Sequence, residues 1–395
     1  MGRIFMREVP SVVRSRLTPR LVRSRSLCAV LAGAWAFTLL LYPQISSAGA
    51  ILFGGNNSLS KAFCHQKTFR KTVVYIDDMM MRHGDTSWAQ TLAGKLEATL
   101  TPGERVSVVE LSPAQGLSQE IWSGCWPNYP SRKLAALKHQ SSFFSESPLK
   151  SLKDQQKIFM NAFGGALTKI YKKGLAQAHP NEIQPGHAPR KLILEALASD
   201  GGRFIQSSNT IRAIVYSDLA ENGNTWSVFG KSSASPTSAG GRLGTSFRHT
   251  VFYFFGVGSD VEGDSGYLSS TRRFWSAALA SMQGTIEGIG SDLNVPNDLP
   301  IAAYDYSLSL NRNGTQLFGR ASLLVDADGN LVDSWIGINR LTFVGLAGTF
   351  QCHGKGGCRL RARTEGGLTT DSSSESVDLA GATPQQLKGR AGVRG

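Results

Sequence analysis

Short apolar runs alternate with helical patterns along residues 72–282, and this alternation constrains the fold more than any other feature of the chain. Residues 72–77 form an apolar run that ends in acids, as a buried parallel strand does. Residues 88–100 carry a large apolar side chain at every fourth position, which is typical of an amphipathic helix, and a second strand is expected at 105–111. Further strands are expected at 211–217 and 250–257, and further helices at 152–171, 191–198 and 271–282. The pattern predicts an α/β fold with a doubly wound, mostly parallel sheet that helices cover on both faces.

The pattern changes near residue 298. Short alternating runs then follow one another, with the turn signals Asn313-Gly314 and Asp328-Gly329 between them, and these features predict a small antiparallel β-meander domain at 298–364. Residues 365–395 are polar, rich in Gly and Ser and without periodicity, so we expect a disordered tail there. The α/β domain is expected at 71–292, with an irregular insertion at 112–150 and a lead-in segment at 49–70.

The chain begins with a pattern typical of an export leader. Residues 1–26 contain seven Arg and one Glu, residues 27–42 are apolar, and small residues follow at 46–50. This order predicts a signal peptide over 1–48, cleaved near Ala48 or Ala50, and a periplasmic or secreted protein without stable membrane insertion after cleavage. An uncleaved anchor helix is the alternative.

Removal of this leader also changes the charge. The whole chain has 42 basic and 29 acidic residues and a net charge of +13, and loss of residues 1–48 lowers that charge to about +7. Because almost half of the excess belongs to the leader, and no aromatic–basic motif is present, we expect no nucleic-acid partner.

Cysteine usage agrees with an oxidising compartment. Cleavage leaves four Cys, which allow three pairings: Cys64, Cys125, Cys352 and Cys358. The flexible loop between Cys352 and Cys358 favours a local bridge, which leaves Cys64 with Cys125. The alternative is a metal site made by Cys352, His353 and Cys358, for which no fourth ligand lies nearby.

Acidic residues follow two of the expected strands. Asp77 and Asp78 end the first strand, and Asp218 follows the strand at 211–217. In an open α/β sheet, ligands bind at the carboxyl ends of strands where the strand order reverses, so neighbouring strands would bring these carboxylates together. Mg²⁺ or Ca²⁺ would compensate their repulsion. The alternative is that each Asp caps a turn or a helix.

Several segments resemble the von Willebrand factor type A-like family, in order and spacing. They are residues 72–78 with the helix that follows, residues 102–109, residues 214–219, and residues 252–258 with the helix around Phe274 and Trp275. The resemblance covers about residues 70–290. It implies an exported bacterial protein whose role is to bind a protein at the top of the sheet.

The same resemblance implies a degenerate metal-ion-dependent adhesion site. Asp77 matches the first Asp of the family motif, whereas Met79 and Met81 occupy its two Ser positions. Asp218 matches the third-loop Asp, with Leu219 in place of Gly; no Thr can be placed, and its expected region is around Arg190 and Lys191. Thioethers do not serve hard cations, so we expect no bound metal or other cofactor, with Mg²⁺ or Ca²⁺ as the alternative. The binding surface is expected to consist of Asp78, Met79, Met81, His83 and Leu219.

Two functions remain open at this point. The first is an exported, non-enzymatic protein-binding or scaffold protein of the cell envelope, with no catalytic residues and a protein partner in the envelope. The second is a metal-dependent hydrolase or phosphotransfer enzyme that uses Asp77, Asp78 and Asp218.

Overall fold

A computed structural model describes the chain at residues 2–8, 62–66, 68–139, 148–177, 189–205, 210–224, 226–228, 235–258, 265–339, 342–353, 356–368 and 373–392. Residues 1–9 and 57–395 form one compact unit. This unit contains a six-stranded α/β sheet and a separate closed barrel of eight antiparallel strands. Among the described residues, no helix combines the length and the apolar character that crossing a membrane requires.

The α/β sheet has the strand order β4-β3-β2-β5-β6-β7. All neighbouring strands run parallel except β4, which is antiparallel to β3 at the edge. The strands are β2 (Arg70–Asp77), β3 (Arg105–Ser112), β4 (Leu117–Cys125), β5 (Thr210–Tyr216), β6 (Thr250–Phe255) and β7 (Thr285–Ile289). The chain leaves β2 for β3 on one side and later returns to β5 on the other, so the strand order reverses between β2 and β5. This confirms the mostly parallel α/β sheet and puts its switch point beside Asp77.

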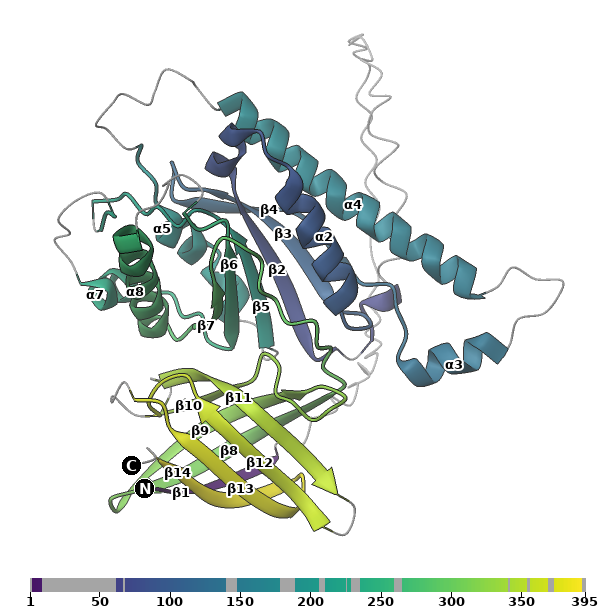
Figure 1. The fold of residues 1–395 in the computed structure, drawn as a ribbon, viewed down its shortest axis with the longest axis vertical. Helices are drawn as coiled ribbons and strands as arrows, with labels where there is room; N and C mark the ends of the chain where they lie inside the picture. The colour runs from purple at the N-terminus through teal and green to yellow at the C-terminus, as the bar shows by residue number, and fades with distance from the viewer. Residues whose placement is uncertain are drawn as a thin grey trace, which may run out of the picture. The chain divides into compact units, whose positions relative to one another are not determined.

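Helices cover both faces of this sheet (Figure 1). One apolar cluster joins it to α2 and α4, and another joins it to α5, α7 and α8. The helices are α2 (Ser87–Thr99), α3 (Ser131–His139), α4 (Pro148–Gln177), α5 (Ile193–Ser199), α6 (Gly201–Ile205), α7 (Pro236–Arg242) and α8 (Ser265–Ser281). The central strands β5 and β6 are buried at every position, as expected for strands packed on both faces.

The barrel is closed in the order β1-β14-β13-β12-β11-β10-β9-β8. Its strands are β1 (Gly2–Glu8), β8 (Ala302–Arg312), β9 (Thr315–Val325), β10 (Trp335–Ile338), β11 (Thr342–His353), β12 (Gly357–Thr364), β13 (Ser376–Thr383) and β14 (Gln386–Gly392). Alternate side chains fill its interior, so the barrel has an apolar core of its own. The turn at Asn313 and Gly314 has φ values of 52° and 80°, which fits the two-residue hairpin that the sequence predicts.

Three expectations about the chain's organisation are wrong. The segment expected as a disordered tail, 365–395, contributes strands β13 and β14, because Val377, Leu379 and Leu387 point into the barrel core. The small domain is therefore a closed barrel and not a meander confined to 298–364. The segment 112–150 is not simply an insertion, since it contains the edge strand β4 and helix α3.

Residues 2–8, expected within the signal peptide, form strand β1 between β14 and β8. A chain that has lost residues 1–48 would therefore lack one of the eight barrel strands. The apolar run at 27–42 and the proposed cleavage sites lie outside the described residues, so the leader itself stays a prediction.

Both expected disulfides are present in the structure. Cys64 bonds to Cys125 at the end of β4, and Cys352 bonds to Cys358 directly across the β11–β12 hairpin. The two sulfurs of the alternative site around His353 are thus already bonded to each other.

A network of buried charges connects the barrel to the amino ends of the parallel strands. Arg70 donates from Nε to Glu104 Oε1 at 3.1 Å and from Nη1 to Asp333 Oδ2 at 2.6 Å. Tyr253 donates its hydroxyl to Asp333 Oδ1 at 2.6 Å, and Arg212 lies 3.5 Å from Glu104. Burial acts to raise the pKa of Glu104, but Arg70 and Arg212 lower it below its ordinary value. Asp333 belongs to the barrel part of the chain, so its carboxylate links the two parts.

Substitution of Asp333 by Ala tests this link. The change leaves Arg70 with Glu104 as its only acidic partner and removes the acceptor of Tyr253, so we expect the free energy of unfolding to fall by about 3–5 kcal/mol. Denaturant unfolding measures the loss. Asp378→Ala is the matched control, because the ion pair of Asp378 with Arg359 is exposed and its loss should leave stability nearly unchanged. Equal effects of the two substitutions would contradict the prediction.

Candidate functional site

Strand β2 ends by placing Asp77 at the start of a short 3₁₀ helix, η1 (Asp78–His83). Asp77 Oδ1 accepts the backbone N–H of Met79 at 3.0 Å, so the side chain caps this helix. Asp77 Oδ2 accepts the hydroxyl of Ser217 at 2.7 Å. The residue is fully buried, and both carboxylate oxygens are oriented by the local backbone and by the neighbouring strand.

Asp218 follows β5, the strand next to β2. Its Oδ1 accepts the backbone N–H of Ala220 at 2.9 Å, an interaction that fixes the turn after the strand. Leu219 within this turn has a φ of 57°. Parallel pairing of β2 with β5 puts Asp77 and Asp218 at the same edge of the sheet, as the sequence predicts.

The ammonium group of Lys191 lies between these two carboxylates. Lys191 Nζ is 2.9 Å from Asp77 Oδ2 and 2.6 Å from Asp218 Oδ1, and the residue is only 3% exposed. The backbone of Lys191 exchanges two hydrogen bonds with Asn222, which holds the segment before α5 against the loop after β5. We call Asp77, Lys191 and Asp218 the buried ion triad.

Electrostatics keep the lysine charged in the triad. Burial acts to lower the pKa of Lys191, but the carboxylates of Asp77 and Asp218 outweigh it and raise the pKa above its ordinary value. Burial also raises the pKa of Asp77, and Asp218 adds to this effect while Lys191 opposes it. With both carboxylates ionised, two negative charges share one positive charge in a dry environment.

This arrangement bears on metal binding. A hard cation at the switch point would use Asp77 and Asp218 as oxygen ligands, but the position between them holds an ammonium group. In the part of the chain that the structure describes, no group of three or more His, Cys, Asp and Glu residues is placed to hold a metal ion. The triad supplies internally the positive charge that a cation would bring.

Asp78 is separate from the triad. Asp78 is 5% exposed, and its Oδ2 accepts a hydrogen bond from the hydroxyl of Ser112 at 2.8 Å. Burial raises the pKa of Asp78 to about 7; Ser112 opposes this shift, and the charge of Asp77 adds to it. Asp78 therefore titrates near neutral pH, and its side chain accepts a hydrogen bond from Ser112 rather than from a member of the triad.

Several residues of the expected binding surface lie inside the protein. Met81 and Leu219 have no exposed surface and belong to the two sheet cores, so they are not available to a partner in this structure. Asp78 is buried as well, and Met79 is half-buried. The side chain of His83 lies outside the described residues. Arg190, next to Lys191 in the sequence, is by contrast exposed.

Sequence reasoning missed Lys191 as a functional residue, although it marked that region as the place for a missing Thr. The available signal was a Lys directly before the apolar start of a helix, in the region expected to supply the Thr of the family motif. Glu221 was missed too. It is 3% exposed and accepts the backbone N–H groups of Ile193 and Leu194, at 2.9 and 3.0 Å, at the start of α5.

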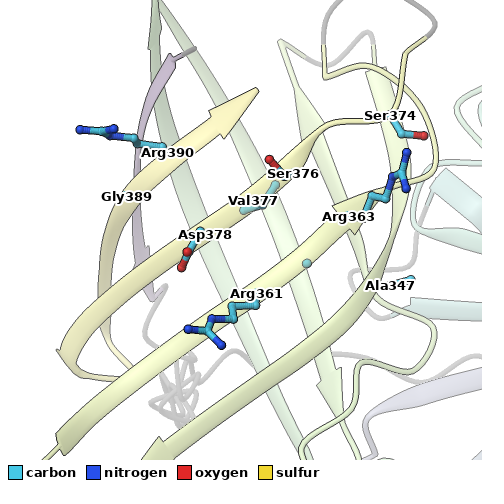
Figure 2. Close-up of a pocket in the computed structure, with 10 residues that line it drawn as sticks. Ala347, Arg361, Arg363, Ser374, Ser376, Val377, Asp378, Gly389 and Arg390 are labelled. Carbon is cyan, nitrogen blue, oxygen red and sulfur yellow. The ribbon is translucent and has the colours of Figure 1, made fainter. Parts of the chain in front are cut away.

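The barrel carries a pocket of about 940 Å³ on its outer side, which is lined in part by Arg361, Arg363 and Arg390. Figure 2 shows Arg361 and Arg363 on β12 and Arg390 on β14, with their guanidinium groups pointing away from one another. The pocket therefore lacks a convergent set of donors for a small anion. Arg361 and Arg363 share one outer face of β12, a strand that is paired with β11 on one side and with β13 on the other.

Comparisons with known proteins give little further information. No family model and no curated protein matches this sequence. One similar solved structure is the crystal structure of the ArnB paralog VWA2 from Sulfolobus acidocaldarius, with 10% sequence identity and a TM-score of 0.28. The match covers 82% of this chain and 66% of that one, so it spans slightly less than two thirds of that protein. A similarity at this level does not assign the chain to a family.

Substitution of Lys191 by Met tests the buried ion triad. The variant leaves Asp77 and Asp218 facing each other without a cation, so we expect the free energy of unfolding at pH 8 to fall by about 3–5 kcal/mol. Folding would then raise the carboxylate pKa values, so stability would fall as pH rises, and the loss at pH 5 should be smaller. Denaturant unfolding at both pH values measures this. Arg190→Met removes a neighbouring exposed charge and should change stability little; an equal loss at both pH values in Lys191→Met would count against the prediction.

Asp78→Asn should make the protein more stable at alkaline pH. Because folding raises the pKa of Asp78 from 3.8 to about 7, the wild-type protein loses stability as pH rises between these values. Asn stays neutral and can still accept the Ser112 hydroxyl. We expect a gain on the order of 1–3 kcal/mol at pH 8 that disappears near pH 4, measured by urea unfolding. Asp154→Asn, on the exposed side of α4, is the control for charge removal. If stability depends on pH in the same way in Asp78→Asn as in the wild type, the raised pKa of Asp78 is refuted.

Proposed function

We propose that this protein is an exported, non-enzymatic binding module of the cell envelope, built on a type A-like α/β domain, whose partner binds at the carboxyl edge of the sheet without a metal ion. The observation that carries the proposal is the position of Lys191 Nζ between Asp77 and Asp218. The ammonium group supplies positive charge between the carboxylates, where a divalent cation would otherwise be needed, so the edge keeps its shape in the absence of divalent cations.

The type A-like assignment is supported by strand order and sequence together. The three strands from β2 to β4 occupy one half of the sheet, with β4 antiparallel at its edge, and β5 to β7 occupy the other. The segments at 72–78, 214–219 and 252–258, on which the family resemblance depends, fall at the ends of β2, β5 and β6. The Asp positions of the family motif thus lie next to the switch point.

Export is supported by the leader pattern and by the disulfides. Both cysteine pairs are at bonding distance, and such bridges persist in an oxidising compartment. The basic, apolar and small-residue order of residues 1–50 is the second support. The two observations are independent, since one concerns the folded chain and the other its targeting.

A metal-dependent hydrolase or phosphotransfer enzyme has less support. That chemistry needs Asp77, Asp78 and Asp218 to converge on a cation that polarises a substrate. Asp77 and Asp218 share Lys191 instead, and Asp78 accepts a hydrogen bond from Ser112 on β3.

Affinity capture from envelope extracts tests the proposal. The purified exported protein should retain the same partner in Mg²⁺ and in EDTA, because Lys191 replaces the cation. Titration calorimetry with Mg²⁺ or Ca²⁺ should show no binding heat. Capture of nothing at native salt, or capture that EDTA abolishes, would overturn the proposal.

Two charge reversals locate the binding surface in the same assay. Arg190→Glu changes an exposed residue next to the buried ion triad and should weaken capture at least severalfold. Arg132→Glu makes the same change at an exposed residue of α3. Helix α3 follows Cys125, whose β4 position lies opposite Arg105 at the amino end of β3, so α3 follows the opposite end of the sheet in sequence. This variant should leave capture unchanged. Loss of capture in both variants, or in neither, would show that the partner does not bind at the carboxyl edge.

A further inference from the structure

Residues 2–8 lie within the predicted leader, yet in the structure they form a strand of the closed barrel. An exported chain cannot keep them in both places. As strand β1 they pair antiparallel with β14 through residues 2–7 and with β8 through residues 3–8. The backbone N–H of Glu8 also donates to Gln385 O at 2.8 Å. Strand β1 is therefore the element that joins the first and the last of the other seven barrel strands.

Two side chains of β1 enter the barrel core. Ile4 is 2% exposed and lies opposite Leu310 on β8, and Met6 is fully buried opposite Leu308. Met6 also lies opposite Leu387 on β14. Both residues belong to the apolar cluster of the barrel, so the space that β1 occupies has two apolar sites separated by one outward-facing position.

Export would take β1 away from the other seven strands, and this step rests on the proposed function. A leader rich in Arg stays on the cytoplasmic side while the chain that follows is translocated. Residues 2–8 precede the apolar run at 27–42, so they remain on that side, whereas the barrel strands from residue 302 onward cross.

The seven strands that remain have two free edges. β8 and β14 each pair with β1 but not with each other. Strands lie about 4.8 Å apart, so the missing strand leaves about 10 Å between these edges, too far for direct hydrogen bonds. Unpaired backbone groups on two facing edges, above two empty apolar sites, form a receptor for an extended segment. We call it the β8–β14 slot.

We propose that the exported barrel binds an extended segment of an envelope partner protein in the β8–β14 slot, as an added strand antiparallel to both edges. The segment carries two large apolar side chains two residues apart, which take the sites of Ile4 and Met6. The backbone of the bound segment forms hydrogen bonds with β8 on one side and β14 on the other, in the register that β1 shows.

Charge on the outer side of the slot distinguishes such a segment from β1 itself. Arg3 of β1 lies directly opposite Arg390 of β14, and like charges at directly opposite positions are unfavourable. Lys388 Nζ lies 5.2 Å from the ring centroid of Phe5, a favourable cation–π contact. The slot therefore favours an acidic residue at the position of Arg3 and an aromatic residue at that of Phe5.

The test uses the full chain, produced in an exporting bacterial host and recovered from the soluble exported fraction, with its amino terminus determined by intact mass. The probe is a fluorescent peptide of residues 2–9, with three variants: Arg3→Glu, Phe5→Ala, and the double change Ile4→Asp with Met6→Asp. We expect saturable binding by fluorescence anisotropy and a rise in the melting temperature. The Arg3→Glu peptide should bind about twofold to fivefold tighter, Phe5→Ala weaker, and the double variant not at all.

The outcomes separate this inference from the proposed function. Absence of the protein from the exported fraction, or soluble exported protein that keeps residues 2–8, removes the export step on which the slot depends. Processed, folded protein that fails to bind the peptide overturns the slot while leaving export intact. A dimer that the peptide dissociates would assign the slot to a second copy of the chain and overturn the proposed partner.

Discussion

Neutralisation of buried charge at the two ends of the parallel strands is the constraint on which the rest of this structure depends. At the amino ends, Arg70 and Arg212 are compensated by Glu104 and by Asp333 from the barrel. At the carboxyl ends, Lys191 compensates Asp77 and Asp218. Removal of one partner from either group would leave an uncompensated charge in a dry environment, which is among the most destabilising changes that a single residue can make.

These two groups of charges have different consequences. The group at the amino ends joins parts of the chain that are far apart in sequence, since Arg70 and Asp333 are separated by 263 positions. Trp335 reinforces the same contact, because its indole N–H donates to Thr210 and its ring stacks on His249. The buried ion triad instead joins three segments of one domain: the end of β2, the segment before α5 and the loop after β5.

Whether a strand can be predicted from the sequence depends on whether its own residues carry the pattern or whether distant segments stabilise it. The strands at 72–77 and 250–257 are predictable because a strand buried on both faces is apolar along most of its length. Strand β4 was missed because it is an edge strand that mixes polar and apolar residues without a continuous apolar run. Strands β13 and β14 were missed because each places few apolar side chains, among them Leu379 and Leu387, between Gly, Ser and charged residues. These two strands are stabilised by pairing with other strands of the barrel, and the local sequence pattern carries no information about which strands will pair.

The sequence by itself determined the α/β sheet, the two cysteine pairs and the position of Asp77 and Asp218 at strand ends, because each depends on local periodicity, spacing or loop length. Only the tertiary structure decided that Lys191 lies between the two carboxylates, that Met81 and Leu219 are buried, and that residues 2–8 close the barrel. Each of these features is a contact between segments far apart in the chain, and long-range pairing is set by how packed elements fit together rather than by any one segment.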